Sequence, residues 1–171
     1  MRELSGKLTP EKGDGRRGKR NPDPERLFEG AGPLVQRLRA ESPFISAAAM
    51  MSRARQILEE LGGAEQVAVI NAHPRIGENA EQVRAQSQAS FKEQGYDGDD
   101  TPSDALVRLA RLNQEYEQKF GFRFVVFVNG RPKAALIPVL EARLKRSRVE
   151  ELQTALADIV AIAEDRLRQE T

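Results

Sequence analysis

Residues 148–169 have the sequence RVEELQTALADIVAIAEDRLRQ, and this stretch decides the fold class of the chain. Its apolar side chains recur at every third or fourth position, which places them on one face of an α-helix. The face consists of Leu152, Leu156, Ile159, Ile162, Ala163 and Leu167, with Arg166 among them. The spacing therefore predicts one long amphipathic helix near the C-terminus.

Two segments further toward the N-terminus show the same periodicity. One helix is expected to begin at residues 101–104 and to end at Gly121, because glycine commonly closes a helix. Another is expected between Ser42 and the glycines at 62–63, with Ser42 as its cap and Pro43 at its first position. Both segments predict amphipathic helices that cover a common core.

Most of the remaining chain also has helical patterns, with helices expected at residues 26–28, 33–38, 79–93 and 132–146. Residues 64–72 are apolar enough to form either a buried helix or a strand. Residues 122–128 have strand propensity, but one strand makes no sheet, so we expect a buried extended segment there. The sequence therefore predicts an all-α protein with a single domain of about seven to eight helices over residues 23–171.

The composition excludes several classes of protein. A length of 171 residues is typical of one domain, and the absence of cysteine excludes disulfides and thiolate catalysis and fits a reducing compartment. The net charge of +1 gives no global reason to expect nucleic-acid binding. No stretch approaches the roughly 20 apolar residues of a membrane span, and no signal peptide or peroxisomal address is visible. We therefore expect a cytoplasmic protein that binds neither nucleic acid nor membranes.

Residues 1–22 differ in composition from the rest of the chain. Lysine and arginine alternate there with glycine, and almost nothing is apolar. Such a segment cannot offset its ordering entropy by burial, so we expect a flexible arm. A nucleic-acid or acidic-partner arm is the alternative, which the interspersed Glu3, Glu11 and Asp14 weaken.

His73 is the one histidine of the chain. Histidine has an unperturbed pKa of about 6.5, so it can both give and take a proton near neutrality. Pro74 follows it and disfavours helical backbone angles at His73, which places the imidazole at a helix end. A lone histidine is more often structural, so the choice between a structural and a functional His73 depends on its surroundings.

Several motifs in order resemble the OHCU decarboxylase family, where OHCU is 2-oxo-4-hydroxy-4-carboxy-5-ureidoimidazoline. The motifs are Ala72-His73-Pro74-Arg75-Ile76-Gly77, Ser90-x-x-Glu93-Gln94, Asn113-x-x-Tyr116-x-x-Lys119-Phe120-Gly121-Phe122-x-Phe124, Glu141-x-Arg143-Leu144 and Ala155-Leu156-x-x-Ile159-x-x-Ile162-Ala163-x-x-Arg166-Leu167. Each motif alone is weakly specific, but their order and spacing from about Leu27 to Leu167 make the resemblance specific.

The resemblance implies the decarboxylation of OHCU to (S)-allantoin, the last step of urate degradation, without a cofactor. It also implies an all-helical fold, a homodimer, and a functional link to urate oxidase and 5-hydroxyisourate hydrolase. No metal is expected, since one histidine and no cysteine make a poor zinc site.

The resemblance assigns catalysis to His73 and Glu93. It assigns substrate binding to Pro74, Ser90, Gln94 and Arg166, with Arg168 as the alternative to Arg166, and to the backbone of Phe124, Val125 and Val126. Our hypothesis gives His73 the acid–base role. Glu93 would hold substrate N–H groups or orient His73, and Arg166 would bind a ring or ureido oxygen. Arg123 departs from the family pattern, because several members have proline there.

Structural explanations remain open for each of these residues. Glu93, Gln94 and Ser90 could face solvent on a polar helix, and Arg166 could be a rim residue that extends to water. Tyr116 has core spacing, with its hydroxyl expected at the edge of the core. For the whole chain, the alternatives are a non-catalytic helical interaction module with a basic N-terminal arm, a nucleic-acid-binding protein and a metal-dependent hydrolase.

Overall fold

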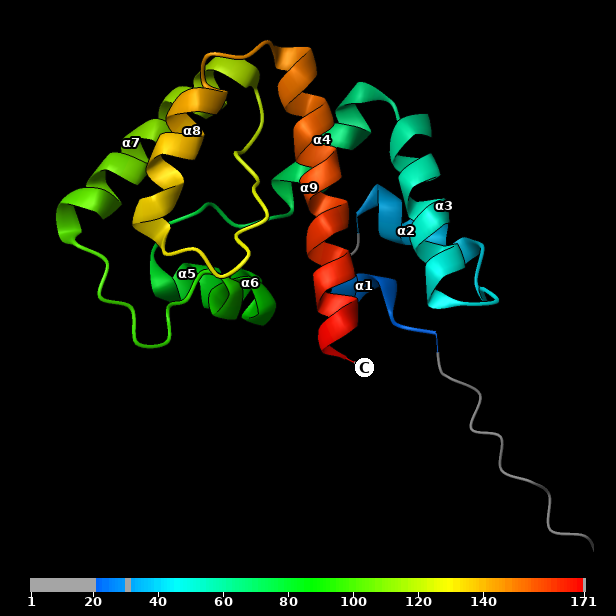
Figure 1. Cartoon of the computed structure of the whole chain (residues 1–171). Helices are drawn as coiled ribbons and strands as arrows, with labels where there is room; N and C mark the ends of the chain where they lie inside the picture. The colour runs from blue at the N-terminus through cyan, green and yellow to red at the C-terminus, as the bar shows by residue number, and fades with distance from the viewer. Residues whose placement is uncertain (1–20, 30–31, 171) are drawn as a thin grey trace, which may run out of the picture.

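The protein is helical throughout the part that its computed structural model describes, residues 21–29 and 32–170. Those ranges contain nine α-helices, one 3₁₀ helix and no β-strand (Figure 1). They are α1 (Pro24–Leu27), α2 (Pro33–Ala40), α3 (Ala47–Glu60), α4 (Gly63–Asn71), α5 (Ala80–Gln86), α6 (Gln88–Glu93), α7 (Ser103–Phe120), the 3₁₀ helix η1 (Lys133–Leu136), α8 (Ile137–Arg143) and α9 (Arg148–Gln169). No helix in this described part is both long and apolar enough to cross a membrane. The all-α prediction is confirmed.

Helix α9 lies in the middle of the fold and packs against α1, α3, α4 and α7 (Figure 1). Its buried face includes Ile159, Ile162 and Ala163, as the helical spacing predicts. Ser147 begins the helix with a capping box, in which its hydroxyl accepts from the Glu150 N–H at 3.3 Å and its own N–H donates to Glu150 Oε2 at 2.8 Å. The central helix is therefore the element to which both halves of the chain attach.

The start of α3 differs from the expectation. Ser42 does not cap this helix, which begins at Ala47 and is capped by Ser46, whose Oγ accepts from the Ala49 N–H at 3.0 Å. Ser42 instead donates its hydroxyl to the Leu38 carbonyl at 3.1 Å, at the end of α2. Two serines lie near the same helix start, and local sequence does not decide between them.

Residues 79–93 form the two helices α5 and α6 instead of one, which accounts for the ninth helix. Ser87 separates them with an extended backbone, φ −157° and ψ 114°, and its Oγ caps α6 by accepting from the Ser90 N–H at 3.0 Å. The same hydroxyl donates to Glu29 Oε1 at 3.0 Å. A contact with a distant part of the chain fixes this break, so no local pattern indicates it.

The two ambiguous segments adopt definite structures. Residues 64–72 belong almost wholly to helix α4 rather than to a strand. Residues 122–128 are extended and buried, as expected, and have no paired strand within the described chain. Arg143 holds this segment by donating from Nη1 to the Val125 carbonyl at 2.8 Å. The extended segment thus gains from a side chain the hydrogen bond that a neighbouring strand would otherwise supply.

Tyr116 lies fully inside the core, so the expected position of its hydroxyl at the core edge is wrong. The hydroxyl donates to Glu151 Oε1 at 2.6 Å, and Glu151 is 0% exposed. Arg143 Nε donates to the same oxygen at 2.6 Å, and Arg146 Nη1 donates to Glu151 Oε2 at 2.9 Å. The two guanidinium groups stabilise a buried carboxylate, which gives the phenol its partner and joins α7, α8 and α9.

The basic arm expected at residues 1–22 lies almost wholly outside the described residues, which begin at Asn21. Asn21 Nδ2 donates to the Phe44 carbonyl at 2.6 Å, and Asp23 caps α1 by accepting from the Glu25 N–H at 3.1 Å. The described chain is therefore anchored to the helical domain from its first residues.

Tyr116→Phe is expected to lower the free energy of unfolding by about 2 kcal/mol, because a hydrogen bond to a charged group contributes about 1.5–3 kcal/mol. Urea denaturation would show a lower midpoint at unchanged slope. Tyr96→Phe is the matched control, since the Tyr96 hydroxyl donates to a neutral carbonyl, that of Glu78, and should cost only about 1 kcal/mol. Equal losses in the two variants would contradict the stabilising role of the Tyr116–Glu151 bond.

Candidate functional site

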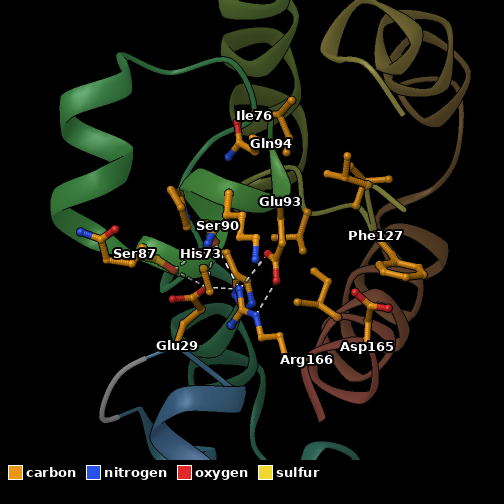
Figure 2. A pocket seen from close by; sticks show the side chains of 18 of the residues that line it. Glu29, His73, Ile76, Ser87, Ser90, Glu93, Gln94, Phe127, Asp165 and Arg166 are labelled. Carbon is orange, nitrogen blue, oxygen red and sulfur yellow. Dashed lines mark hydrogen bonds and ion pairs between the residues drawn. The ribbon is translucent and has the colours of Figure 1, made fainter. Parts of the chain in front are cut away.

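A cleft of about 880 Å³ opens beside α9 (Figure 2). Its walls come from the ends of α1 and α9, the loop after α4, helix α6 and the extended segment around residues 124–130. All nine predicted site residues line it, namely His73, Pro74, Ser90, Glu93, Gln94, Phe124, Val125, Val126 and Arg166. Arg168 does not line the cleft and is exposed. The fold thus brings distant motifs to one place, with Arg166 rather than Arg168 among them.

His73 lies just beyond the end of α4, where Pro74 places it. Its backbone N–H donates to the Ile70 carbonyl at 3.1 Å, and its side chain is buried, with 4% of the residue exposed. Neither Nδ1 nor Nε2 has a hydrogen-bond partner within the described residues. Buried polar groups are nearly always paired, so an unpaired imidazole that lines a cleft is suited to a bound molecule.

Arg123 holds the backbone at His73 and was not predicted to do so. Its Nη1 donates to the carbonyls of Asn71 and His73, each at 3.0 Å, and its backbone N–H donates to Asn71 Oδ1 at 3.0 Å. Proline, which several family members have at this position, lacks both donors. The departure noted in the sequence therefore affects how the histidine is positioned.

Burial lowers the pKa of His73 to about 4. The Glu29 carboxylate opposes this shift and the Arg166 guanidinium reinforces it. At neutral pH the imidazole is therefore uncharged, with one nitrogen as a donor and the other as an acceptor. In this state it can take a proton from a bound molecule and return it to another atom.

Arg166 is buried between two carboxylates rather than exposed at a rim. Its Nε donates to Glu93 Oε1 at 2.7 Å, and its Nη2 donates to Glu93 Oε2 at 2.9 Å and to Glu29 Oε1 at 2.5 Å (Figure 2). Nη1 donates to the Leu27 carbonyl at 3.2 Å. The pKa of Arg166 is raised, because these hydrogen bonds and charges outweigh its burial. The pairing fixes the orientation of the guanidinium, which lines the cleft.

Glu93 does not orient His73 in this structure, contrary to one of the two roles hypothesised for it. Both of its carboxylate oxygens accept from Arg166, and its side chain is 24% exposed. Glu93 is therefore only partly exposed to solvent, and it lies at the cleft as the ion-pair partner of the buried Arg166.

Gln94 binds the loop that carries the histidine. Its Oε1 accepts from the Gly77 N–H at 3.0 Å, and its Nε2 donates to the Arg75 carbonyl at 3.2 Å. Gly77 has φ 76°, and a Cβ there would lie 3.1 Å from Leu109 Cδ1, so glycine is required. The amide therefore ties α6 to the turn that follows Pro74 and is not solvated.

Lys133 holds the end of α6, next to Gln94, in place. Its ammonium is buried, donates to the Gln94 carbonyl at 2.7 Å, and pairs with Asp99 Oδ2 at 2.7 Å. It also lies 3.9 Å from the centre of the Tyr96 ring. Lys133 thus joins the end of α6 to the start of η1.

Glu29 is a cleft residue that sequence reasoning missed. Its Oε1 accepts from the hydroxyls of Ser87 at 3.0 Å and Ser90 at 2.8 Å, besides Arg166. Burial raises the pKa of Glu29, but Arg166, His73 and Ser90 together favour the carboxylate more, so the pKa lies below its ordinary value. A single acidic residue after a short helix has no distinctive pattern, and no local signal identifies it.

These groups are suited to proton transfer on a small polar molecule. One cleft contains a neutral imidazole, a guanidinium that is paired with two carboxylates, and a serine hydroxyl. Among the described residues, no group of three or more acidic or histidine side chains has the arrangement of a metal site.

Comparison with known proteins identifies similar sequences over most of the chain. The family model for OHCU decarboxylase matches residues 25–168. A 2-oxo-4-hydroxy-4-carboxy-5-ureidoimidazoline decarboxylase of Haloferax volcanii is 29% identical over 143 residues, which cover 84% of this chain and 83% of that protein. A uric acid degradation bifunctional protein of Bacillus sp. strain TB-90 is 30% identical over 143 residues, which cover 84% of this chain but 28% of that protein. The chain therefore spans about a quarter of the bifunctional relative.

Two solved structures share the fold. A crystal structure of OHCU decarboxylase in the presence of (S)-allantoin matches with a TM-score of 0.70 and 24% identity, and the match covers 87% of this chain and 97% of that one. A crystal structure of (S)-allantoin synthase matches with a TM-score of 0.62 and 17% identity, over 85% of this chain and 47% of that one. At these identities the likeness concerns the helical fold.

The low pKa of His73 predicts a specific loss of stability in acid. The unfolded chain binds a proton at His73 near pH 6.5, whereas the folded protein does so only near pH 4. The contribution of His73 to stability is therefore complete above pH 6.5 and falls by about 3 kcal/mol as the pH drops to 4.

Urea denaturation at pH 7.5 and at pH 4.5 measures this loss. Wild type should lose more stability between the two values than His73→Asn, which keeps every carboxylate but cannot titrate at this position. Identical losses in both proteins would contradict the buried, neutral state of the imidazole.

Proposed function

Because the chain belongs to the OHCU decarboxylase family, we propose that it removes CO₂ from 2-oxo-4-hydroxy-4-carboxy-5-ureidoimidazoline and forms (S)-allantoin. The proposal takes its substrate from the curated relatives and its product from a solved structure of similar fold. The observation that carries it in this chain is the buried, unpaired imidazole of His73 in a polar cleft.

The chemistry of the substrate suits a site without a cofactor. Its name places a hydroxyl and a carboxylate on one ring carbon, next to the carbon that bears the ureido group and the ring double bond to nitrogen. When the bond to the carboxylate breaks, CO₂ leaves and the electron pair moves into the ring. The hydroxyl then becomes a carbonyl, the ureido-bearing carbon gains a proton, and the ring nitrogen takes one proton from solvent.

His73 is assigned the transfer of the internal proton. A neutral imidazole accepts the proton of the substrate hydroxyl and, as an imidazolium, delivers it to the ureido-bearing carbon. Delivery from one fixed side of the ring would produce one hand of the product, which is why we propose (S)-allantoin. The buried position of His73 and the backbone contacts from Arg123 support a fixed direction of approach.

Arg166 is assigned a neutral oxygen of the substrate ring or ureido group. Its cation is already paired with Glu29 and Glu93, and a free cation on the departing carboxylate would stabilise the ground state. Within the described residues, Nη1 donates only to the Leu27 carbonyl, which leaves one N–H of that nitrogen for a ligand. Glu93 would accept N–H groups of the substrate.

The other predicted residues are assigned to the walls of the substrate site. Ser90 and Gln94 would contribute neutral hydrogen bonds, Pro74 would shape the wall beside the imidazole, and the extended backbone of Phe124, Val125 and Val126 would face the planar ring. Gln94 keeps a second N–H on Nε2 after its bond to the Arg75 carbonyl.

The reaction places the chain after the oxidation of urate and the hydrolysis of the oxidised ring. The bifunctional relatives of uric acid degradation support this place, and urate oxidase and 5-hydroxyisourate hydrolase are the enzymes to which we link it. We further propose a homodimer in the cytoplasm that works without a metal or organic cofactor.

Activity is tested by generating OHCU from urate with urate oxidase and the hydrolase, then following the circular dichroism of allantoin. Wild type should accelerate formation of the (S) enantiomer over the spontaneous racemic decay. His73→Asn should lower kcat by about 10²–10⁴-fold, the usual contribution of acid–base catalysis. A wild-type protein that leaves the decay rate unchanged would instead favour the non-catalytic interaction module.

Arg166→Lys tests the substrate role of the guanidinium. Lysine keeps the charge but not the planar set of donors, so KM should rise about tenfold or more. Arg168→Lys is the matched control on the same helix, and its KM and kcat should match those of wild type. Equal effects of the two substitutions would contradict the assignment to Arg166.

A further inference from the structure

Glu29 is a buried carboxylate for which the proposed reaction has no role. It follows α1, lines the cleft with His73 and is 8% exposed. We propose that Glu29 is a positioning residue that holds Arg166 and Ser90 at the cleft and balances the charge of His73 when this imidazole carries a proton. The inference rests on the proposed acid–base function of His73.

The hydrogen bonds of Glu29 connect three segments that form the cleft. Its Oε1 accepts from Ser87 at the junction of α5 and α6, from Ser90 within α6, and from Arg166 on α9 (Figure 2). Removal of this one oxygen would leave the buried hydroxyl of Ser90 and the half-buried hydroxyl of Ser87 without this acceptor, and the guanidinium of Arg166 without its second carboxylate. Glu29 therefore determines where the donors of Ser90 and Arg166 point.

Ser90 has its direction set by this contact. Its hydroxyl donates to Glu29 at 2.8 Å and receives from Arg166 Nη2 at 3.3 Å. With its proton committed to Glu29, Ser90 offers a ligand only the remaining electron pair of its oxygen. The carboxylate thus makes Ser90 an acceptor toward the substrate rather than a donor.

The backbone of Glu29 is held by the same contacts. Its φ of 57° lies in the left-handed region, which residues other than glycine rarely adopt. Such a conformation persists where the surrounding structure fixes it. Here three hydrogen bonds converge on the side chain of the residue that adopts it.

The charges around His73 require a counter-ion. The charged side chains that act on His73 are Glu29, after α1, and Arg166, on α9. Glu93 on α6 lines the same cleft, as do Glu25, Arg26, Lys92, Asp165 and Glu170. Arg123 reaches only the backbone carbonyl of His73. The carboxylate of Glu93 accepts from Arg166 with both oxygens, so the two charges compensate each other. A proton on His73 would then remain unbalanced beside Arg166 without Glu29.

Glu29 has the free capacity for this role. All three of its hydrogen bonds end on Oε1, and within the described residues none ends on Oε2. Its charge also acts on the imidazole at rest, where it raises the pKa of His73 against the effect of burial. The carboxylate therefore favours the protonated intermediate form of His73 while the resting form stays neutral.

Glu29→Gln tests the role of the charge, because glutamine keeps the size and one oxygen acceptor. The single histidine of the chain gives one imidazole C2–H resonance, which can be followed by NMR without substrate from pH 7 to the acid limit of the folded protein. The titration of His73 should shift down by about one pH unit in the variant. In the coupled allantoin assay, kcat should fall about tenfold, a part of the full acid–base contribution, with a smaller change in KM.

Glu25→Gln is the matched control. Glu25 lies on α1, four residues before Glu29, and lines the same cleft, but it pairs with Arg39. Its replacement should leave both the NMR titration and kcat as in wild type. Glu29→Asp provides a second variant, which keeps the charge on a shorter side chain and should retain more of the His73 titration while lowering kcat through the lost contacts. This variant carries the test if Glu29→Gln does not fold.

An unchanged His73 titration in both variants would overturn the counter-ion role, even if stability or kcat falls. Wild-type kcat in both variants would overturn the positioning role. The NMR measurement needs no substrate, so failure of the wild type to consume OHCU would count against the proposed function and not against the link between Glu29 and His73.

Discussion

The buried guanidinium of Arg166 is the constraint on which the arrangement of the cleft depends. An unpaired buried cation would destabilise the protein by several kcal/mol, so carboxylates must lie beside it. Glu29 comes from the chain just after the first described helix and Glu93 from α6, and both reach Arg166 on the last helix. The charge requirement therefore brings the chain after α1 and helix α6 to α9, and the space between them becomes a polar cleft beside the apolar core.

The same charged centre determines the resting state of His73. Burial keeps the imidazole neutral, and the groups around it do not use its two nitrogens. Its position is instead set through its backbone, which Arg123 holds directly and Gln94 holds through the following turn. The protein thus separates the placement of the histidine, which is fixed through its backbone, from the chemistry of its side chain.

The fold was predictable from sequence to the extent that it depends on local repeats. The apolar face of α9 and the glycine that ends α7 are readable, because burial of one helix face imposes a spacing of three and four. His73 was predictable as a helix-end residue from Pro74, and the motif resemblance indicated eight further residues that line the cleft. Ser87 and Glu29 were not predictable, since the helix break and the missed carboxylate depend on a contact between residues 58 positions apart. The hydrogen bonds of Arg123 to the backbone at Asn71 and His73 also join residues far apart in the sequence, so they were not predictable either.

The buried ammonium of Lys133 connects two parts of the chain beside the cleft. It links the end of α6 to the chain that leaves the extended segment. Separation of these two parts would strip a buried charge of its partners. Arg26 and Glu170, which also line the cleft, form an exposed ion pair at 3.4 Å. Exposed pairs weaken as salt rises. Rising salt therefore weakens this exposed pair more than the buried pair of Lys133 and Asp99.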